Sequence, residues 1–209
     1  IVSPPAPGLV VGGRMRHPGR QRAAARPDIR GFFSGLLGYT ELDLRQGEVG
    51  ELTGSLVIDR ARGIGYAGLG ERCTRAAAQA MVEAFGLRAL LCADLAAGEY
   101  HTNVVLSVLA GRMAVICAEG FADPAAAEAI ASVYAPQVLW LEPAQKNAFA
   151  ANCMSLASDS VWMSTRAADS LRPDQRLQLE RAGFALRSVE LDEIEKAGGS
   201  LRCCVAEIY

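Results

Sequence analysis

VVLSVLAGRMAVICAEG, residues 104–120, consists of two apolar β-rich runs joined by a turn that contains glycine, which is the pattern of a β-hairpin. Two other stretches have the same form: SLVIDRARGIGYAGL (55–69) and CMSLASDSVWMS (153–164). Each hairpin is followed by a helical pattern and a further apolar run. After the hairpin that ends at residue 120, these are DPAAAEAIASVYA and then QVLWLEP. The sequence therefore predicts an α/β fold built from a repeated strand, strand, helix, strand unit.

The repeat has a constant period. The hairpins begin near Ser55, Val104 and Cys153, about 49 residues apart, which is a period typical of radial or stacked architectures. One further step reaches Arg202 in the run LRCCVAEIY, which we expect to be the final strand. In a closed ring, the residues just before the first strand of each unit occupy equivalent places and converge near the axis.

Five polar residues hold these converging places: Glu51, His101, Asn103, Asn152 and Cys203. A cysteine nucleophile needs a group that holds its thiolate or moves protons, and a histidine distant in sequence but close in space is the usual partner. A carboxylate at the same place can bind a cation. Together these residues predict a site at the centre of the ring.

Composition and charge narrow the class of protein. The chain has 209 residues, of which 51% are hydrophobic, so it can bury a core and we expect one domain over residues 1–209. A formal net charge of −2 gives no field that would attract a polyanion, so nucleic acid is not an expected partner. No apolar run is long enough to span a membrane, and the start IVSPPAPG lacks the pattern of a signal peptide, so we expect a cytoplasmic protein.

The six cysteines lie mostly in apolar, strand-like runs. This placement suits small buried residues in a reducing compartment better than a disulfide framework. The sequence has no CxxC pair, so it does not predict a metal site.

Four ordered motifs resemble those of the amidinotransferase and arginine-deiminase superfamily, most closely its citrulline-utilisation hydrolase branch: ELTGSLVIDR (51–60), YHTNVVLSV (100–108), FAANCMSL (149–156) and GGSLRCCVAEIY (198–209). The resemblance extends over nearly the whole chain, because GLVVGGRMRHPGRQRAAARPDIR (8–30) is similar to the strand and arginine-rich loop of that family. It implies a pseudo-fivefold α/β propeller whose central channel binds a guanidino or ureido group. About four of the five units are recognisable, and the chain starts at Ile1 without a methionine, so we expect the propeller to be N-terminally incomplete.

The same resemblance implies a role for each central residue. Cys203 is the expected nucleophile, His101 the general acid and base, and Glu51 a catalytic and substrate-binding carboxylate. The thiolate would attack the guanidino or ureido carbon and leave a covalent thiouronium-like intermediate, which water then hydrolyses. This chemistry needs no cofactor and no metal. Since side chains alternate along a strand, Cys204 is expected to point into the core and Arg202 away from the pocket.

Asn103, Asn152 and Asp59 are the further candidate substrate-binding residues. In members that act on arginine the motif at the histidine resembles HxD, whereas this chain has HTN, and the amide of Asn103 suits a neutral ureido group such as that of citrulline better than a cation. Alternatively, Asn103 caps a turn and Asp59 opens the hairpin turn. The arginine-rich stretch from residue 14 to residue 30 is expected to be a solvated loop rather than a binding site for a substrate carboxylate.

Three functions fit these residues. The first is a cysteine-dependent hydrolase of carbon–nitrogen bonds in a small guanidino or ureido amino acid. The sequence does not decide whether the chain forms a homodimer. The second is an amidinotransferase, which uses the same intermediate but passes it to an amine. The third is a truncated pseudoenzyme that keeps the pocket as a ligand-binding module. The resemblance favours hydrolysis.

Overall fold

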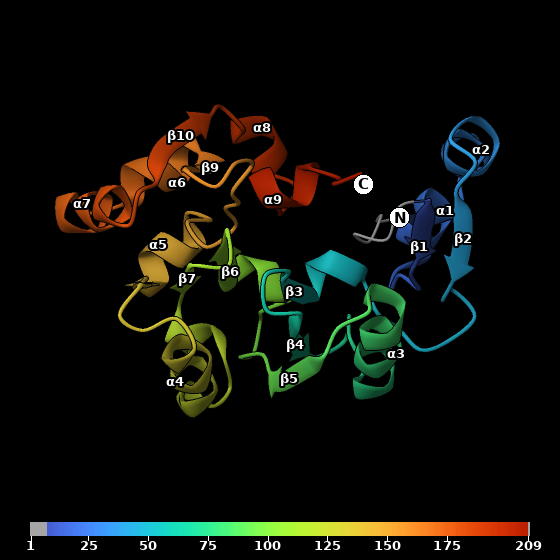
Figure 1. The fold of residues 1–209 in the computed structure, drawn as a ribbon, viewed down its shortest axis with the longest axis horizontal. Coiled ribbons are helices and arrows are strands. Elements are labelled where there is room, and N and C mark those ends of the chain that lie inside the picture. Colours follow the sequence, from blue (N-terminus) through green and yellow to red (C-terminus); the bar gives the residue numbers. More distant parts are fainter. Residues whose placement is uncertain (1–7, 209) are drawn as a thin grey trace.

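The computed structural model describes residues 8–208, so the start of the chain, where no signal peptide is expected, lies outside the described residues together with residue 209. Within this range, four small sheets follow one another around a common centre, from the N-terminal pair in blue to the C-terminal pair in red (Figure 1). The strands are β1 (Leu9–Gly12), β2 (Thr40–Asp43), β3 (Leu56–Asp59), β4 (Ile64–Leu69), β5 (Ala89–Asp94), β6 (Leu106–Leu109), β7 (Met113–Ile116), β8 (Val138–Trp140), β9 (Ser160–Ser164) and β10 (Ala185–Val189). The helices are α1 (Pro18–Ala24), α2 (Pro27–Gly31), α3 (Arg75–Phe85), α4 (Pro124–Ser132), α5 (Pro143–Asn147), α6 (Thr165–Ser170), α7 (Pro173–Arg181), α8 (Asp192–Glu195) and α9 (Leu201–Cys204), with short helical turns η1 (Phe32–Leu36), η2 (Leu52–Gly54), η3 (Thr102–Val104) and η4 (Ala118–Gly120).

The unit around residues 100–140 has the predicted order. β6 pairs antiparallel with β7, and β7 pairs parallel with β8 after the crossover through α4. The hairpin turn places both Ala110 and Gly111 at positive φ, 48° and 65°, which glycine adopts without steric cost. α4 begins where the Asp123 side chain accepts a hydrogen bond from the backbone N–H of Ala125 at 2.9 Å, with Pro124 in the first turn.

The preceding unit repeats this arrangement. β3 pairs antiparallel with β4, and β4 pairs parallel with β5 after α3. α3 starts at Thr74, whose hydroxyl accepts from the backbone N–H of Ala77 at 3.1 Å, and it ends at Gly86 in the left-handed conformation. The strand, strand, helix, strand unit predicted from the sequence is therefore present twice in full.

Each of the remaining two sheets has only two strands, and these pair in parallel as the second and third strands of the full unit do. β9 and β10 are parallel. The predicted hairpin over residues 153–164 is reduced to one antiparallel bridge, in which Met154 and Trp162 of β9 exchange backbone hydrogen bonds of 3.0 and 2.8 Å. β1 and β2 are also parallel, connected through α1 and α2.

The core lies between neighbouring sheets. β7 is buried on both faces: Ala114 and Ile116 pack with residues of the β3–β5 unit, whereas Met113 and Val115 pack with residues around β9 and α7. This alternation is what a central strand requires when apolar neighbours lie on both sides. No helix of the described residues is long and apolar enough to cross a membrane.

The prediction of a final strand at LRCCVAEIY is wrong. Gly199, at φ 125°, turns the chain into the short helix α9, and Ser200 anchors the turn by donating from Oγ to Glu195 at 2.6 Å. Because side chains do not alternate in a helix, the two expectations drawn from alternation also fail. Cys204 is exposed rather than in the core, and Arg202 lines the central cavities.

Candidate active site

Glu51 and His101 occupy equivalent positions in two consecutive units. Each residue directly precedes a short helical turn, η2 or η3, and that turn leads into the first strand of its unit. Each is only 4% exposed, and Nε2 of His101 lies 2.7 Å from a carboxylate oxygen of Glu51. The repeat thus brings the imidazole and the carboxylate together from positions 50 residues apart in the chain.

The Glu51 carboxylate is held as an anion. Burial alone would raise its pKa, but the hydrogen bond with His101, a hydrogen bond from the backbone N–H of Arg16 at 2.9 Å and the charge of Arg20 lower the pKa to about 2. Arg20 from α1 makes an ion pair with it at 2.8 Å, and Arg72 approaches to 3.5 Å. Two guanidinium groups therefore already lie beside this carboxylate.

Cys203 is presented by α9 to the same place. Burial raises the pKa of its thiol, but hydrogen bonds with His101 and Asn152 and with a backbone group of Ser200 outweigh burial, so the pKa lies below its usual value. Nδ2 of Asn152 donates to the sulfur at 3.3 Å, and the thiol lies 3.7 Å from Oδ1 of Asn103. A larger share of Cys203 is therefore in the nucleophilic thiolate form than in an ordinary cysteine.

Asn103 and Asn152 form an amide pair behind the thiol. Nδ2 of Asn152 donates to the backbone carbonyl of Asn103 at 2.7 Å and lies 3.3 Å from its side-chain Oδ1. Nδ2 of Asn103 in turn donates to the carbonyl of Thr53 at 3.2 Å. Both ends of the Asn103 amide are thus engaged within the protein. The role of Asn103 in substrate binding stays a prediction.

A cavity of about 360 Å³ exposes these groups. It is lined by Glu51, His101, Asn103, Cys203 and Cys204, among others, and Arg20 forms part of its rim. A carboxylate, an imidazole and a thiol with lowered pKa therefore open onto one space large enough for a small amino acid. Among the described residues, no group of three or more histidine, cysteine, aspartate or glutamate side chains is arranged to hold a metal ion.

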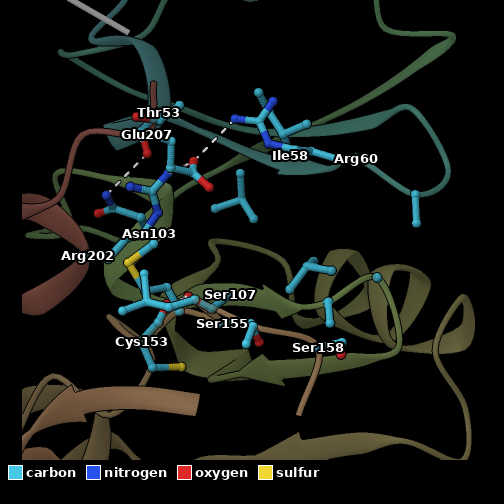
Figure 2. A pocket seen from close by; sticks show the side chains of 18 of the residues that line it. Thr53, Ile58, Arg60, Asn103, Ser107, Cys153, Ser155, Ser158, Arg202 and Glu207 are labelled. Carbon is cyan, nitrogen blue, oxygen red and sulfur yellow. Dashed lines mark hydrogen bonds and ion pairs between the residues drawn. The ribbon is translucent and has the colours of Figure 1, made fainter. Parts of the chain in front are cut away.

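A second cavity of about 410 Å³ shares Thr53, Asn103, Arg202 and Glu207 with the first. Figure 2 shows Arg60, Glu207 and Arg202 gathered at one end of it, with Asn103 beside them. Glu207 lies 3.2 Å from both arginines, and these ion-paired groups, apart from Arg60, also line the first cavity. The ion-pair cluster therefore lies where the two cavities adjoin.

Asp59 does not reach the cavity that holds Cys203. Its fully buried carboxylate accepts from the hydroxyl of Tyr134 at 2.8 Å and pairs with Arg62 at 2.9 Å. These internal partners satisfy it at the end of β3, in agreement with the alternative that Asp59 supports the hairpin turn. The structure thus gives no support to Asp59 as a substrate-binding residue.

The arginines at Glu51 were missed by the sequence analysis. Arg20 belongs to the stretch expected to be a solvated loop, and the structure folds that stretch into α1 beside the cavity. Arg72 lies over the ring of Tyr100, 4.9 Å from its centroid, and the same ring contacts His101. No local pattern distinguishes these two arginines from the other arginines of the chain, so only their position in space identifies them.

Comparison with known proteins supplies a family. The sequence model of the family of eukaryotic N,N-dimethylarginine dimethylhydrolases matches residues 34–209 of this chain. A comparison with curated proteins finds no match.

Solved structures share the fold. The N-terminal domain of ArgZ bound to substrate, an arginine dihydrolase from the ornithine–ammonia cycle in cyanobacteria, has 23% identity and a TM-score of 0.81, and the match covers 96% of this chain and 71% of that one. A variant of AgrE bound to L-arginine has 22% identity and a TM-score of 0.80, covering 100% of this chain but 30% of that one. A dimethylarginine dimethylaminohydrolase adduct with 4-chloro-2-hydroxymethylpyridine has 16% identity and a TM-score of 0.69, covering 97% and 73%. These likenesses confirm the propeller fold expected from the sequence.

Proposed function

Because the chain belongs to the eukaryotic N,N-dimethylarginine dimethylhydrolase family, within the amidinotransferase and arginine-deiminase superfamily, we propose that it hydrolyses the guanidino group of a small amino acid through a cysteine nucleophile. The observation that carries the proposal is the cavity in which Cys203, with its lowered pKa, meets the His101 and Glu51 pair. Arginine and N,N-dimethylarginine both carry such a guanidino group, and turnover assays distinguish between them.

Each step uses a group of this chain. The Cys203 thiolate adds to the guanidinium carbon, and the carbon–nitrogen bond breaks as His101 gives a proton to the departing nitrogen. An S-alkylthiouronium on Cys203 remains, and ammonia or an amine leaves. Neutral His101 then takes a proton from water, the hydroxide adds to the same carbon, and the carbon–sulfur bond breaks to release a ureido product and the thiolate. Glu51 keeps the imidazole oriented throughout.

Glu51 also supports binding of a cationic substrate. Its carboxylate already pairs with the guanidinium of Arg20, a side chain that is 46% exposed and can move aside. A substrate guanidinium would make the same charge-assisted bonds. Since the Asn103 amide is engaged within the protein, these contacts favour a guanidino substrate over the ureido substrate that the HTN motif suggests.

Arg72 and Arg20 support recognition of the other end of an amino acid. Both lie within 3.5 Å of Glu51, and Arg20 also lines the cavity, so a positive charge faces an incoming substrate. An α-carboxylate entering the cavity would therefore be attracted and oriented by an arginine.

The test measures turnover of N,N-dimethylarginine, arginine and citrulline by the chain, with detection of dimethylamine and ammonia. We expect one of the two guanidino substrates to be hydrolysed and the rate to fall on the order of 10³-fold or more in Cys203→Ala. The matched control is Cys92→Ala, a half-buried cysteine on β5 that does not line the cavity.

Four results would contradict the proposal. Turnover that survives Cys203→Ala would exclude the thiol as nucleophile. Turnover of citrulline alone would overturn the guanidino assignment. No turnover by a folded chain would favour the ligand-binding alternative, and transfer of the amidino group to an added amine would favour the amidinotransferase.

A further inference from the structure

Two adjacent cysteines face the same cavity. Cys203 and Cys204 are both exposed and both line the 360 Å³ cavity, at the end of α9. Their Cα atoms are about 3.8 Å apart because they are consecutive residues. The helix ends at Cys204 and Val205 is already extended, with φ −107° and ψ 126°, so no following helical turn restrains the pair.

The two thiols also influence each other. Burial and the nearby charge of Cys203 raise the pKa of Cys204, and both residues line the same cavity. Cys203 is the more acidic of the two, because its hydrogen bonds stabilise the thiolate. The pair thus offers two thiols of unequal acidity in one accessible space.

The other cysteines differ in both respects. Cys73, Cys117 and Cys153 are buried, and burial raises their pKa values to about 11, 11 and 12. Cys92 is half-buried and its pKa is also raised, again by burial. A reagent that requires two accessible thiols side by side therefore has one site among the described residues.

We propose that Cys203 and Cys204 together form a dithiol site for trivalent arsenicals. An organic arsenoxide, R–As=O, reacts with both thiols to form two arsenic–sulfur bonds, and its oxygen leaves as water with the two thiol protons, so arsenic stays trivalent and no electron is transferred. Two thiolates satisfy such an arsenical. A zinc site needs three or four protein ligands, and no such group is present in the part of the chain that the structure describes.

The consequence is occlusion of the cavity. An arsenic atom that bridges the two sulfurs would lie beside the His101 and Glu51 pair, in the space open to a small molecule. The inference stands on the accessible thiol pair and does not depend on the catalytic proposal, because binding is measured without turnover.

The experiment treats the reduced chain with phenylarsine oxide and measures its intact mass. We expect one adduct that has lost the oxygen of the reagent, that resists excess glutathione and that is removed by 2,3-dimercaptopropanol. In Cys204→Ser and in Cys203→Ser the affinity should fall on the order of 10²-fold, because a single thiol lacks the second, intramolecular bond. Cys92→Ser is the matched control and should bind as the unsubstituted chain does.

Two results would overturn the proposal. One is an adduct in Cys204→Ser that resists glutathione as well as the adduct of the unsubstituted chain does. The other is the absence of an adduct in a sample of the chain from which a separate portion is alkylated by iodoacetamide at both cysteines. Alkylation of that portion shows that the thiols are accessible and the chain is intact.

Discussion

Asn152 offers the sharpest test of how the thiol is activated. Its side chain is fully buried, and Nδ2 donates both to the sulfur of Cys203 at 3.3 Å and to the carbonyl of Asn103 at 2.7 Å. Asn152→Ala removes the bond to the thiolate but leaves the His101 contact in place. The pKa of Cys203 is therefore expected to rise.

The magnitude follows from the energy of one charge-assisted hydrogen bond. Such bonds contribute about 1.5–3 kcal/mol, and one pKa unit corresponds to about 1.4 kcal/mol, so the pKa of Cys203 should rise by about 1 to 2 units. The same substitution leaves the Asn103 carbonyl buried without its donor, which should lower the free energy of unfolding by about 1–3 kcal/mol.

The assay is the rate of iodoacetamide alkylation against pH, in a Cys204→Ser background that removes the second accessible thiol. Gln175→Ala is the matched control, because Gln175 is a buried amide that bonds to Gln145 and to the Trp140 carbonyl, far in sequence from the thiol. It should lose comparable stability without changing the alkylation midpoint. An unchanged midpoint in folded Asn152→Ala would refute the assignment of Asn152 as a group that holds the thiolate.

The remaining predictions concern stability. The pKa of Glu51 is lowered from 4.5 to about 2, so its contribution is present above about pH 4.5 and lost as the pH falls toward 2. The free energy of unfolding in urea should therefore fall over that pH range by on the order of 3 kcal/mol more in the unsubstituted chain than in Glu51→Gln. The same pH dependence of the unfolding free energy in both chains would contradict this. Tyr134→Phe removes the donor to the buried Asp59 carboxylate and should cost about 1–3 kcal/mol in urea unfolding with no change in the Cys203 alkylation rate; a slower rate would connect Asp59 to the site. Gly111→Ala places a Cβ 2.5 Å from that of Ala61 at φ 65° and should lower the unfolding free energy by about 1–3 kcal/mol; unchanged stability would mean that the turn relaxes.

The sequence predicted the spatial relation of Glu51 and His101 because it depends on the repeat. Each residue precedes the first strand of its unit by the same short turn, so a constant period places the two side chains at equivalent sites around the centre. The hairpins themselves are readable for a similar reason, since alternation and turn residues are local features. The third hairpin, reduced to one bridge at Met154, shows how far the pattern can weaken while the position of Asn152 before it is kept.

The local structure at Cys203 was not readable in the same way. The apolar run after Arg202 has the composition of a strand, but a strand needs a neighbouring strand, and the left-handed turn at Gly199 sends the chain into a helix instead. Sequence patterns record propensity, whereas pairing is decided by tertiary structure. Although the final strand is absent, Cys203 lines the same cavity as Glu51 and His101. Cys204, which was expected in the core, is exposed.

Burial of a carboxylate does not by itself identify a substrate-binding site, as a comparison of Asp59 with Glu51 illustrates. Both are nearly or fully buried and both bond to an arginine. The partners of Asp59 are the Tyr134 hydroxyl and Arg62, whose side chain is 38% exposed, and Asp59 is not among the residues that line the two central cavities. Glu51 instead pairs with Arg20, a half-exposed side chain at the rim of a cavity, so a small cation can take the place of a partner. The difference is access: the Glu51 carboxylate opens onto a cavity that can admit a small molecule, whereas the Asp59 carboxylate lies outside that cavity and supports the hairpin turn.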